Sequence, residues 1–238
     1  MIYQLARVLL APVLLGQGLY VRRVTPRLPE PEGLRFGTLG TGPKMKILIL
    51  GDSAAAGVGA GTQKNALSGR LIKALGSSHE VSWKLVAQTG DASSQVIARL
   101  RSLPNEVFDT VVVSVGVNDV TSQTGDKEWL HNLESIIELL KSKFHVQHII
   151  LSSLPPMHLF PALPQPLRWW LGLRAKKLSN SMESFAGNDK QCTFLSVPFP
   201  FEQNLIAVDG FHPGEPAYRL WGEELAKLIR TEVSSLND

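Results

Sequence analysis

The chain has 238 residues, 44% hydrophobic and 19% charged, which suits one sizeable α/β domain or two small ones and excludes a disordered protein. The net charge of +3 comes from residues 1–44, where six basic residues face two acidic ones, whereas residues 45–238 hold 18 basic and 19 acidic residues. This balance argues against nucleic acid as a partner, and the single cysteine, Cys192, excludes an intramolecular disulfide and a Cys-rich metal site.

Residues 1–24 form an apolar segment with a basic end. The stretch Val8–Val21 reads VLLAPVLLGQGLYV and is followed by Arg22, Arg23 and Arg27. A membrane-spanning helix needs about 20 apolar residues, so this stretch is too short to span comfortably. It favours an anchor in the membrane interface, with the arginines at anionic headgroups. A cleaved signal peptide and a helix packed on its own domain are the alternatives.

The same arginines indicate on which side of a membrane the rest of the chain would lie. The positive-inside rule places Arg22, Arg23 and the domain after them on the cytoplasmic face. A signal sequence would instead direct that domain to the periplasm or out of the cell. Residues 25–44 are rich in proline and glycine and lack a helical period, which predicts an extended linker. The main domain is therefore expected to comprise residues 45–238.

Within the main domain, short apolar runs alternate with segments of helical spacing. The predicted strands are Lys46–Leu50, Trp83–Gln88, Thr110–Val115, His148–Ser153 and Thr193–Val197. The predicted helices are Asn65–Gly76, Ser93–Leu103, Trp129–Phe144, Arg168–Phe185 and Pro216–Val233. Strands that are apolar on both sides and separated by helices indicate a parallel sheet covered on both faces. We therefore expect an α/β fold with a central parallel sheet of about five strands.

Polar clusters follow the predicted strands. They are Gly51–Ser53 after the first strand, Thr89–Asp91 after the second, Gly116–Asp119 after the third, and Asp209–Pro213 just before the last helix. The carboxyl ends of parallel strands meet at one edge of a sheet, where α/β proteins carry their functional groups. We therefore expect these four clusters to lie together.

The residue types in these clusters favour nucleophilic catalysis. A serine hydroxyl is a weak nucleophile that needs a base, and the base needs an orienting acid. Of the six histidines, His212 lies in such a loop beside a carboxylate, since Asp209, three residues earlier, can accept from its Nδ1. The backbone N–H groups of Ser53 and Gly90 and the side-chain amide of Asn118 are suitable donors to a developing oxyanion.

The small residues that follow Ser53 allow two interpretations. Ala54–Gly57 would keep a nucleophile uncrowded while the backbone approaches a substrate carbonyl. Alternatively, Gly57–Gly61 could cradle a phosphate, but it lacks the Gly-Lys-Ser/Thr ending of a P-loop and the spacing of a dinucleotide fingerprint. The nucleophile elbow of the α/β-hydrolase fold, G-x-S-x-G, would need glycine where Ala55 stands. The sequence therefore disfavours the α/β-hydrolase fold. We therefore predict a nucleophilic serine and neither a metal nor a nucleotide cofactor.

Taken together, in this order and at these strand ends, the motifs resemble those of the SGNH (GDSL-type) hydrolase family. The resemblance spans about residues 46–215. It implies a flavodoxin-like three-layer α/β/α sandwich. It also implies a catalytic triad and an oxyanion hole, the first formed by Ser53, Asp209 and His212 and the second by Ser53, Gly90 and Asn118. Ala54 occupies the place where the GDSL string has leucine, a position that carries no chemistry.

The segment Leu154–Gly172, after the fourth predicted strand, is unusually apolar for a surface loop. It holds five prolines and several large apolar side chains. One interpretation is a wall for an acyl chain or a lip that contacts a membrane, with Phe160, Trp169 and Trp170 as candidate substrate-binding residues. The other is that the segment covers the core or receives the N-terminal segment.

These observations lead to one predicted function with alternatives. We expect a membrane-associated serine esterase or lipase-like acyl hydrolase that acts on a small acyl ester. The same triad would also serve an O-acetylated carbohydrate or an acyl thioester. A rival from another class is a membrane-tethered binding module with a catalytically silent cleft, and the intact set of candidate residues argues against it.

Overall fold

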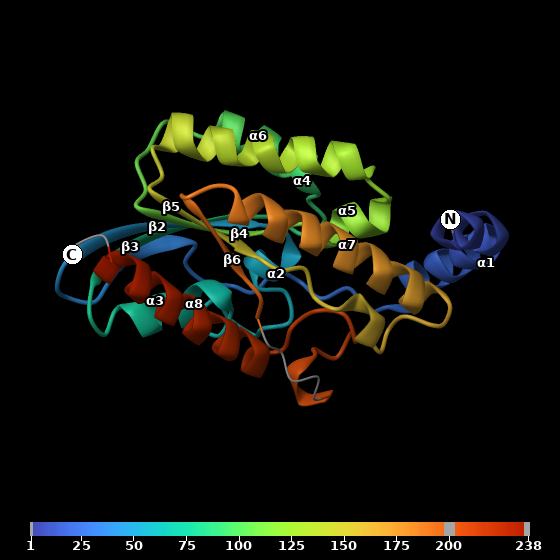
Figure 1. The fold of residues 1–238 in the computed structure, drawn as a ribbon. Coiled ribbons are helices and arrows are strands. Elements are labelled where there is room, and N and C mark those ends of the chain that lie inside the picture. Colours follow the sequence, from blue (N-terminus) through green and yellow to red (C-terminus); the bar gives the residue numbers. More distant parts are fainter. Residues whose placement is uncertain (1, 198–202, 236–238) are drawn as a thin grey trace.

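A six-stranded sheet forms the centre of the molecule (Figure 1). The computed structural model describes residues 2–197 and 203–235, so Met1 of the predicted segment 1–24 lies outside it. The strands are β1 (Phe36–Leu39), β2 (Lys44–Gly51), β3 (Glu80–Ala87), β4 (Thr110–Ser114), β5 (His148–Ser152) and β6 (Cys192–Leu195), in the spatial order β1-β3-β2-β4-β5-β6. Only β1 runs antiparallel to its neighbour. The five parallel strands follow the flavodoxin-like order 2-1-3-4-5.

Helices cover both faces of this sheet. Figure 1 shows α4 and α6 over one face and α3 and α8 over the other. The helices are α1 (Ile2–Val24), α2 (Ser53–Ala56), α3 (Leu67–Leu75), α4 (Ser93–Ser102), α5 (Val117–Ser122), α6 (Asp126–Phe144), α7 (Leu167–Gly187) and α8 (Glu215–Ser235), with 3-10 turns η1 (Met157–Leu159) and η2 (Gln203–Leu205). The predicted three-layer α/β/α architecture is confirmed.

Successive residues of β2 enter opposite cores, which explains why its sequence is continuously apolar. Leu48 and Leu50 pack into the core beneath α4, α6 and α7, whereas Ile47 and Ile49 pack into the core beneath α3 and α8. All four side chains are fully buried. A strand that alternated apolar and polar residues would leave one of the two cores unfilled.

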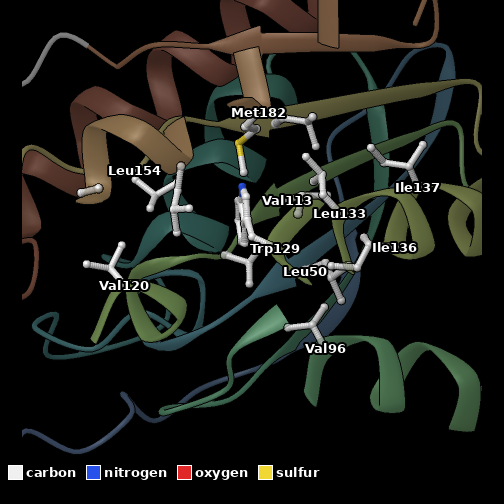
Figure 2. Close-up of a cluster of buried hydrophobic side chains, with 14 of the residues drawn as sticks. Leu50, Val96, Val113, Val120, Trp129, Leu133, Ile136, Ile137, Leu154 and Met182 are labelled. Carbon is white, nitrogen blue, oxygen red and sulfur yellow. The ribbon is translucent and has the colours of Figure 1, made fainter. Parts of the chain in front are cut away.

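Trp129 of α6 lies at the centre of the first core. Figure 2 shows its indole among side chains from the strands, such as Leu50 and Val113, and from α4 and α7. Its ring is fully buried, and its Nε1 donates to Ser181 Oγ of α7 at 3.1 Å. Because the only polar atom of the indole is satisfied, its large apolar surface can fix α6 and α7 over the sheet at no polar cost.

The N-terminal helix α1 packs on the start of α7 and leaves part of its apolar surface exposed. Leu14 is buried, and Gln17 donates to Gln165 O at 2.6 Å and accepts from Leu167 N at 3.0 Å. Several apolar side chains of α1 are exposed, namely Val13, Leu15, Leu19, Tyr20 and Val24. Among the described residues, no helix combines the length and the apolarity needed to cross a membrane.

Residues 25–44, predicted to be an extended linker, contribute a strand to the sheet. β1 pairs along the outer edge of β3, and Glu32 forms a bridge with Thr62. Gly37, one of the glycines that suggested a linker, has a packing role, because a Cβ at this position would lie 2.6 Å from the Trp83 ring. A strand of only four residues at an edge, with a glycine in it, gives little signal in the sequence.

The apolar segment Leu154–Gly172 is largely part of the core. Its buried side chains are Leu154, Met157, Phe160, Leu163, Leu167, Trp170 and Leu171, while Leu159 and Trp169 are exposed. Through Gln165 and Leu167 it also receives α1. The second interpretation of this segment therefore accounts for most of its apolar residues.

Candidate active site

Ser53 begins the short helix α2 directly after β2. The turn needs glycine before it, because Gly51 has φ +159° and a Cβ there would lie 1.9 Å from Ser114 O. Asp52 is the N-cap of α2, and its Oδ1 accepts from Ala54 N at 3.0 Å. The serine is thus held at the carboxyl edge of the sheet between two rigid elements.

The structure brings Ser53, His212 and Asp209 into one hydrogen-bonded chain. His212 Nε2 lies 2.9 Å from Ser53 Oγ, and His212 Nδ1 lies 2.6 Å from Asp209 Oδ2. An ionised carboxylate can only accept, so Nδ1–H donates to Asp209 and the neutral ring accepts from the serine hydroxyl through Nε2. Ser53 and Asp209 are buried, and His212 is partly exposed.

Asp209 is held ionised by the loop that carries His212. Its Oδ1 accepts from the backbone N–H groups of Phe211 and His212, both at 3.0 Å. Burial alone would raise the pKa of Asp209, but the hydrogen bonds from the side chain and backbone of His212 and from Phe211 bring it below its ordinary value. The predicted fold-back of Asp209 onto His212 is therefore present in the structure.

A second carboxyl, that of Asp52, adjoins the serine in a different environment. Its side chain is buried, and one backbone N–H, that of Ala54, donates to it. Burial raises the pKa of Asp52 to about 7, against the opposing effects of the Ala54 hydrogen bond and of His212. Near neutral pH this carboxyl is therefore divided between its protonated and ionised forms.

Besides Ser53 itself, the predicted oxyanion donors Gly90 and Asn118 lie in the segments that follow the two strands beside β2. In the sheet, Gly51 at the end of β2 pairs with Ala87 of β3 on one side and with Ser114 of β4 on the other. Gly90 follows β3, and Asn118 lies in the first turn of α5, which follows β4. Asn118 Nδ2 donates to Asp91 O at 3.0 Å, which joins α5 to the loop after β3, and among the described residues its second amide hydrogen has no acceptor.

Two residues of the predicted linker 25–44 hold the loop after β3, and the sequence analysis missed them. Glu30 accepts from Thr89 N at 2.7 Å and from Thr89 Oγ1 at 2.8 Å. Arg35 pairs with Glu30 at 2.8 Å and donates to Ala87 O. Because Glu30 lies 59 residues from its partner in a stretch that reads as a linker, no local pattern indicates the contact. A domain boundary at residue 44 would remove this support from the neighbour of Gly90.

Asp119 links the start of α5 to the start of α4. It is fully buried and accepts from Ser93 N at 2.9 Å and from Ser93 Oγ at 2.5 Å. Asn132 of α6 donates to the same Ser93 Oγ at 2.9 Å. Burial raises the pKa of Asp119, and its hydrogen bonds with Ser93 oppose that effect. The carboxyl therefore fixes the helix that carries Asn118 against the helix that follows Gly90.

A small apolar cavity of about 80 Å³ adjoins the serine and the histidine. Its lining includes Ser53, Ala54, Leu154, Phe160, Phe211 and His212. The rings of Phe160 and Phe211 meet edge to face, with centroids 5.0 Å apart. Of the small residues after Ser53, Ala54 borders this cavity, whereas Ala55 and Ala56 are fully buried in the core. Close packing, rather than open space for substrate, explains these two alanines.

The three candidate substrate-binding residues occupy different places. Phe160 lines the small cavity, and Trp170 lines a larger groove between α1 and α7. Trp169 is 38% exposed and, within the described part of the chain, lines neither of these hollows. The helical turn of α7 sends neighbouring tryptophans to different faces, which the sequence alone left open.

Comparison with known structures finds a similar fold in esterases and in lipolytic proteins of the G-D-S-L family. A carbohydrate esterase of family 2 with a carbohydrate-binding domain, from Corynascus thermopiles, has a TM-score of 0.65 at 17% identity, covering 88% of this chain and 69% of its own. A lipolytic G-D-S-L family protein from Veillonella parvula has a TM-score of 0.64 at 15% identity, with coverages of 78% and 98%. The psychrotrophic esterase EstA of Pseudoalteromonas sp. has 0.61 at 19%, with 79% and 98%. At these identities the likeness concerns the fold.

The family follows from the sequence itself. The model of the GDSL-like lipase/acylhydrolase family matches residues 49–220, a range that holds Ser53, Gly90, Asn118, Asp209 and His212. The chain therefore belongs to the GDSL-like lipase/acylhydrolase family, and it is a hydrolase. No protein of curated function matches the chain.

Proposed function

We propose that the protein is a serine-dependent acyl ester hydrolase of the esterase or lipase-like kind. The observation that carries this proposal is the continuous hydrogen-bonded chain from Ser53 through His212 to Asp209. Such a chain supplies a nucleophile, a base within hydrogen-bond reach of it, and an acid that orients the base. Membership of a family of lipases and acylhydrolases agrees with this chemistry.

In the proposed reaction His212 moves one proton twice. Ser53 Oγ attacks the ester carbonyl while its proton passes to Nε2, and the ionised Asp209 stabilises the imidazolium that forms. The C–O bond to the alcohol then breaks, and Nε2 returns the proton to the departing oxygen. Water repeats the sequence on the acyl-serine, which releases the carboxylic acid and restores the Ser53 hydroxyl. The N–H groups of Ser53 and Gly90 and the amide of Asn118 are the proposed donors to the oxyanion.

Labelling with a fluorophosphonate and an assay with short esters test the proposal. The wild type is expected to be labelled and active, whereas Ser53→Ala is expected to be neither. His212→Ala is expected to lose nearly as much activity, and the double variant hardly more, because residues that act as a unit are not additive. The exposed Ser77→Ala is the matched control. Additive losses, or labelling that persists in Ser53→Ala, would refute the triad. A wild type that is neither labelled nor active would favour a silent binding module.

The cavity lining bears on the choice between substrate classes. The walls of the hollow beside Ser53 are mainly aliphatic and aromatic, including Val117, Leu154, Phe160 and Phe211. Sugars need several polar partners, whereas apolar chains need such walls. A panel of simple esters, acetylated sugars and acyl thioesters tests this, and we expect the highest kcat/KM for simple esters. A preference for acetylated sugars or thioesters would change the proposed substrate class but not the proposed triad.

We also propose that α1 lies on a membrane surface. Its exposed apolar side chains, among them Val13, Leu15 and Tyr20, are available for insertion below the headgroups. Arg22 and Arg23 lie in its last turn, where they can meet anionic lipid. The helix would then hold the catalytic edge of the sheet next to lipid-like substrates.

A further inference from the structure

A second hollow lies between α1 and the start of α7. It has a volume of about 560 Å³ and is lined mainly by apolar side chains, which include Leu14, Leu15 and Leu19 of α1 and Leu167, Trp170 and Leu171 of α7. We call it the α1–α7 groove. The hydrogen bonds of Gln17 to Gln165 and Leu167 fix its two walls relative to each other.

The α1–α7 groove leads to the reacting atoms. Phe211 and His212 line both the groove and the small cavity, so the two hollows meet at the histidine. Ser53 lines the small cavity, whereas Asp209 lines the groove. An ester bond at Ser53 therefore has one hollow available for each of its two substituents.

The chemistry of the reaction indicates which hollow holds the acyl group and which holds the alcohol of the ester. The acyl group stays bonded to Ser53 Oγ in the intermediate, so it belongs in the small cavity that Ser53 lines. The alcohol departs with the proton that His212 returns, so it lies on the His212 side, where the α1–α7 groove begins. An apolar cavity of about 150 Å³ holds a benzene ring, so a cavity of about 80 Å³ suits an acyl group of a few carbons. The larger groove suits a long chain on the alcohol.

The basic residues of the groove indicate the charge of its ligand. Arg22 and Arg27 line it at the end of α1 and just after it, and both are exposed. In the described part of the lining the acidic residue is Asp209, which is bonded to His212 and to the backbone of its own loop. An anionic group is therefore attracted to this end of the groove, and a cationic one is not.

We propose that the α1–α7 groove binds the hydrocarbon chain of an anionic amphiphilic alcohol, whose short-chain acyl ester is hydrolysed at Ser53. The overall step consumes one ester and one water and releases a short carboxylic acid and the amphiphilic alcohol. This inference rests on the proposed function, because it names the substrate class of the same site. It assigns α1 a part in the substrate-binding site as well as at the membrane.

Chain length in the alcohol tests the apolar wall. The probes are acetate esters of ω-hydroxyalkyl sulfates with butyl, hexyl and octyl chains, all below their micelle concentrations. We expect kcat/KM to rise roughly three- to fourfold per methylene for the wild type. Leu19→Glu is expected to reduce the octyl-to-butyl ratio at least about tenfold, whereas the matched variant Tyr20→Glu, at an exposed residue outside the groove lining, keeps it. Equal ratios in the two variants would overturn the proposal.

The headgroup tests the basic end. The same octyl acetate with a trimethylammonium group in place of the sulfate should be the poorer substrate for the wild type. Arg22→Gln and Arg27→Gln should each reduce the sulfate preference several-fold. Arg23→Gln, an exposed neighbour outside the groove lining, should keep it. A preference that falls equally in all three variants, or that is absent in the wild type, would overturn the proposed anionic ligand.

Failure of this inference can be told from failure of the proposed function. A series of p-nitrophenyl acetate, butyrate and octanoate reports on the acyl side, and we expect kcat/KM to fall beyond butyrate because of the small cavity. If the wild type is labelled at Ser53 and cleaves the short esters without any dependence on the alcohol chain, the groove assignment fails alone. If it is neither labelled nor active, the proposed function fails and the groove assignment falls with it.

Discussion

At the scale of single residues, two buried carboxyls that both interact with His212 have opposite pKa shifts. Asp209 receives three hydrogen bonds, from His212 Nδ1 and from two backbone N–H groups, and these keep its pKa low despite burial. Asp52 receives one from Ala54, and burial raises its pKa to about 7. The hydrogen bonds to Asp209 outweigh its burial, whereas at Asp52 the neighbouring carboxyls of Asp119 and Asp91 add to the effect of burial. Asp209 therefore suits a permanent negative charge beside the imidazole, and Asp52 does not.

This difference predicts how Asp52→Asn changes stability with pH. The folded state disfavours the charged form of Asp52, so its contribution to stability falls as the pH rises from about 4, the ordinary aspartate pKa, to about 7. Relative to the wild type, Asp52→Asn should therefore gain free energy of unfolding across this window and stay level above it. The gain is a few kcal/mol at most, at about 1.4 kcal/mol per unit of pKa difference. Urea titrations from pH 4 to pH 8 measure it.

Asp209→Asn is the control of opposite sign. The lowered pKa of Asp209 adds stability above the ordinary aspartate value, and this stability is lost as the pH falls through the folded value below about 4. The Asp209 carboxyl is ionised in both the folded and the unfolded state above this range, so its own titration should add nothing to the free-energy difference where that of Asp52→Asn changes. A constant difference for Asp52→Asn as well would mean that its carboxyl is ionised in the fold throughout.

At the scale of elements, the sequence predicts strands and helices that have a regular apolar pattern. It misses the strand and the contact whose stabilising partners lie far along the chain. The five parallel strands were predicted from short apolar runs, of which Ile47–Leu50 is buried on both faces. That the strand ends meet at one edge predicts the position of Ser53, which follows β2. Asp209 and His212 lie just before α8, and only their polar cluster assigned them to the same edge. The edge strand β1 and the contact between Glu30 and Thr89 were missed, because their stabilising partners lie far along the chain.

The contact of Glu30 predicts a positioning role for residues 25–44. Glu30 does not contact the proposed reacting atoms but holds Thr89, the neighbour of Gly90. Glu30→Ala should therefore lower kcat for short esters about tenfold and leave KM almost unchanged, because the proposed oxyanion donor of Gly90 would be less well placed. This is smaller than the loss of about 10²–10³ expected for removing a donor outright, as in Asn118→Ala. Steady-state kinetics give both values.

Two variants separate positioning from general stability. Glu30→Gln keeps an acceptor for Thr89 and should recover part of kcat, whereas the exposed Glu32→Gln, two residues on, should match the wild type. A thermal unfolding scan of each variant shows whether the fold is intact. A higher KM with unchanged kcat in Glu30→Ala would make this loop a substrate-binding element instead.

At the scale of the whole molecule, α1 lies along the edge of the domain that carries the candidate site. Leu14 joins the core beneath α7, and the groove between the two helices ends at His212. The apolar run of α1 was visible in the sequence, but the groove was not, because it depends on where Gln17 docks on Gln165 and Leu167. A membrane-bound α1 would therefore keep the groove and the serine close to the lipid surface.

Membrane binding by α1 should have an electrostatic part that can be removed by itself. A basic residue near an anionic surface is worth about 1 kcal/mol, so converting Arg22, Arg23 and Arg27 to glutamine should weaken liposome binding by roughly 3 kcal/mol. High salt should mimic the loss, because screening removes the charge contribution and leaves the apolar one. Co-sedimentation with anionic and neutral liposomes measures both.

The control must distinguish a specific effect of these three arginines from a general effect of the net charge. Lys73, Lys127 and Lys176 are exposed on other helices, and converting all three to glutamine removes the same charge. This variant should bind anionic liposomes like the wild type, and a chain that starts at residue 25 should stay in the supernatant while it keeps Glu30, Arg35 and activity on short esters. Equal losses in the two triple variants would point to unspecific attraction. Wild type that stays in the supernatant with anionic liposomes would make α1 a packed helix of the domain.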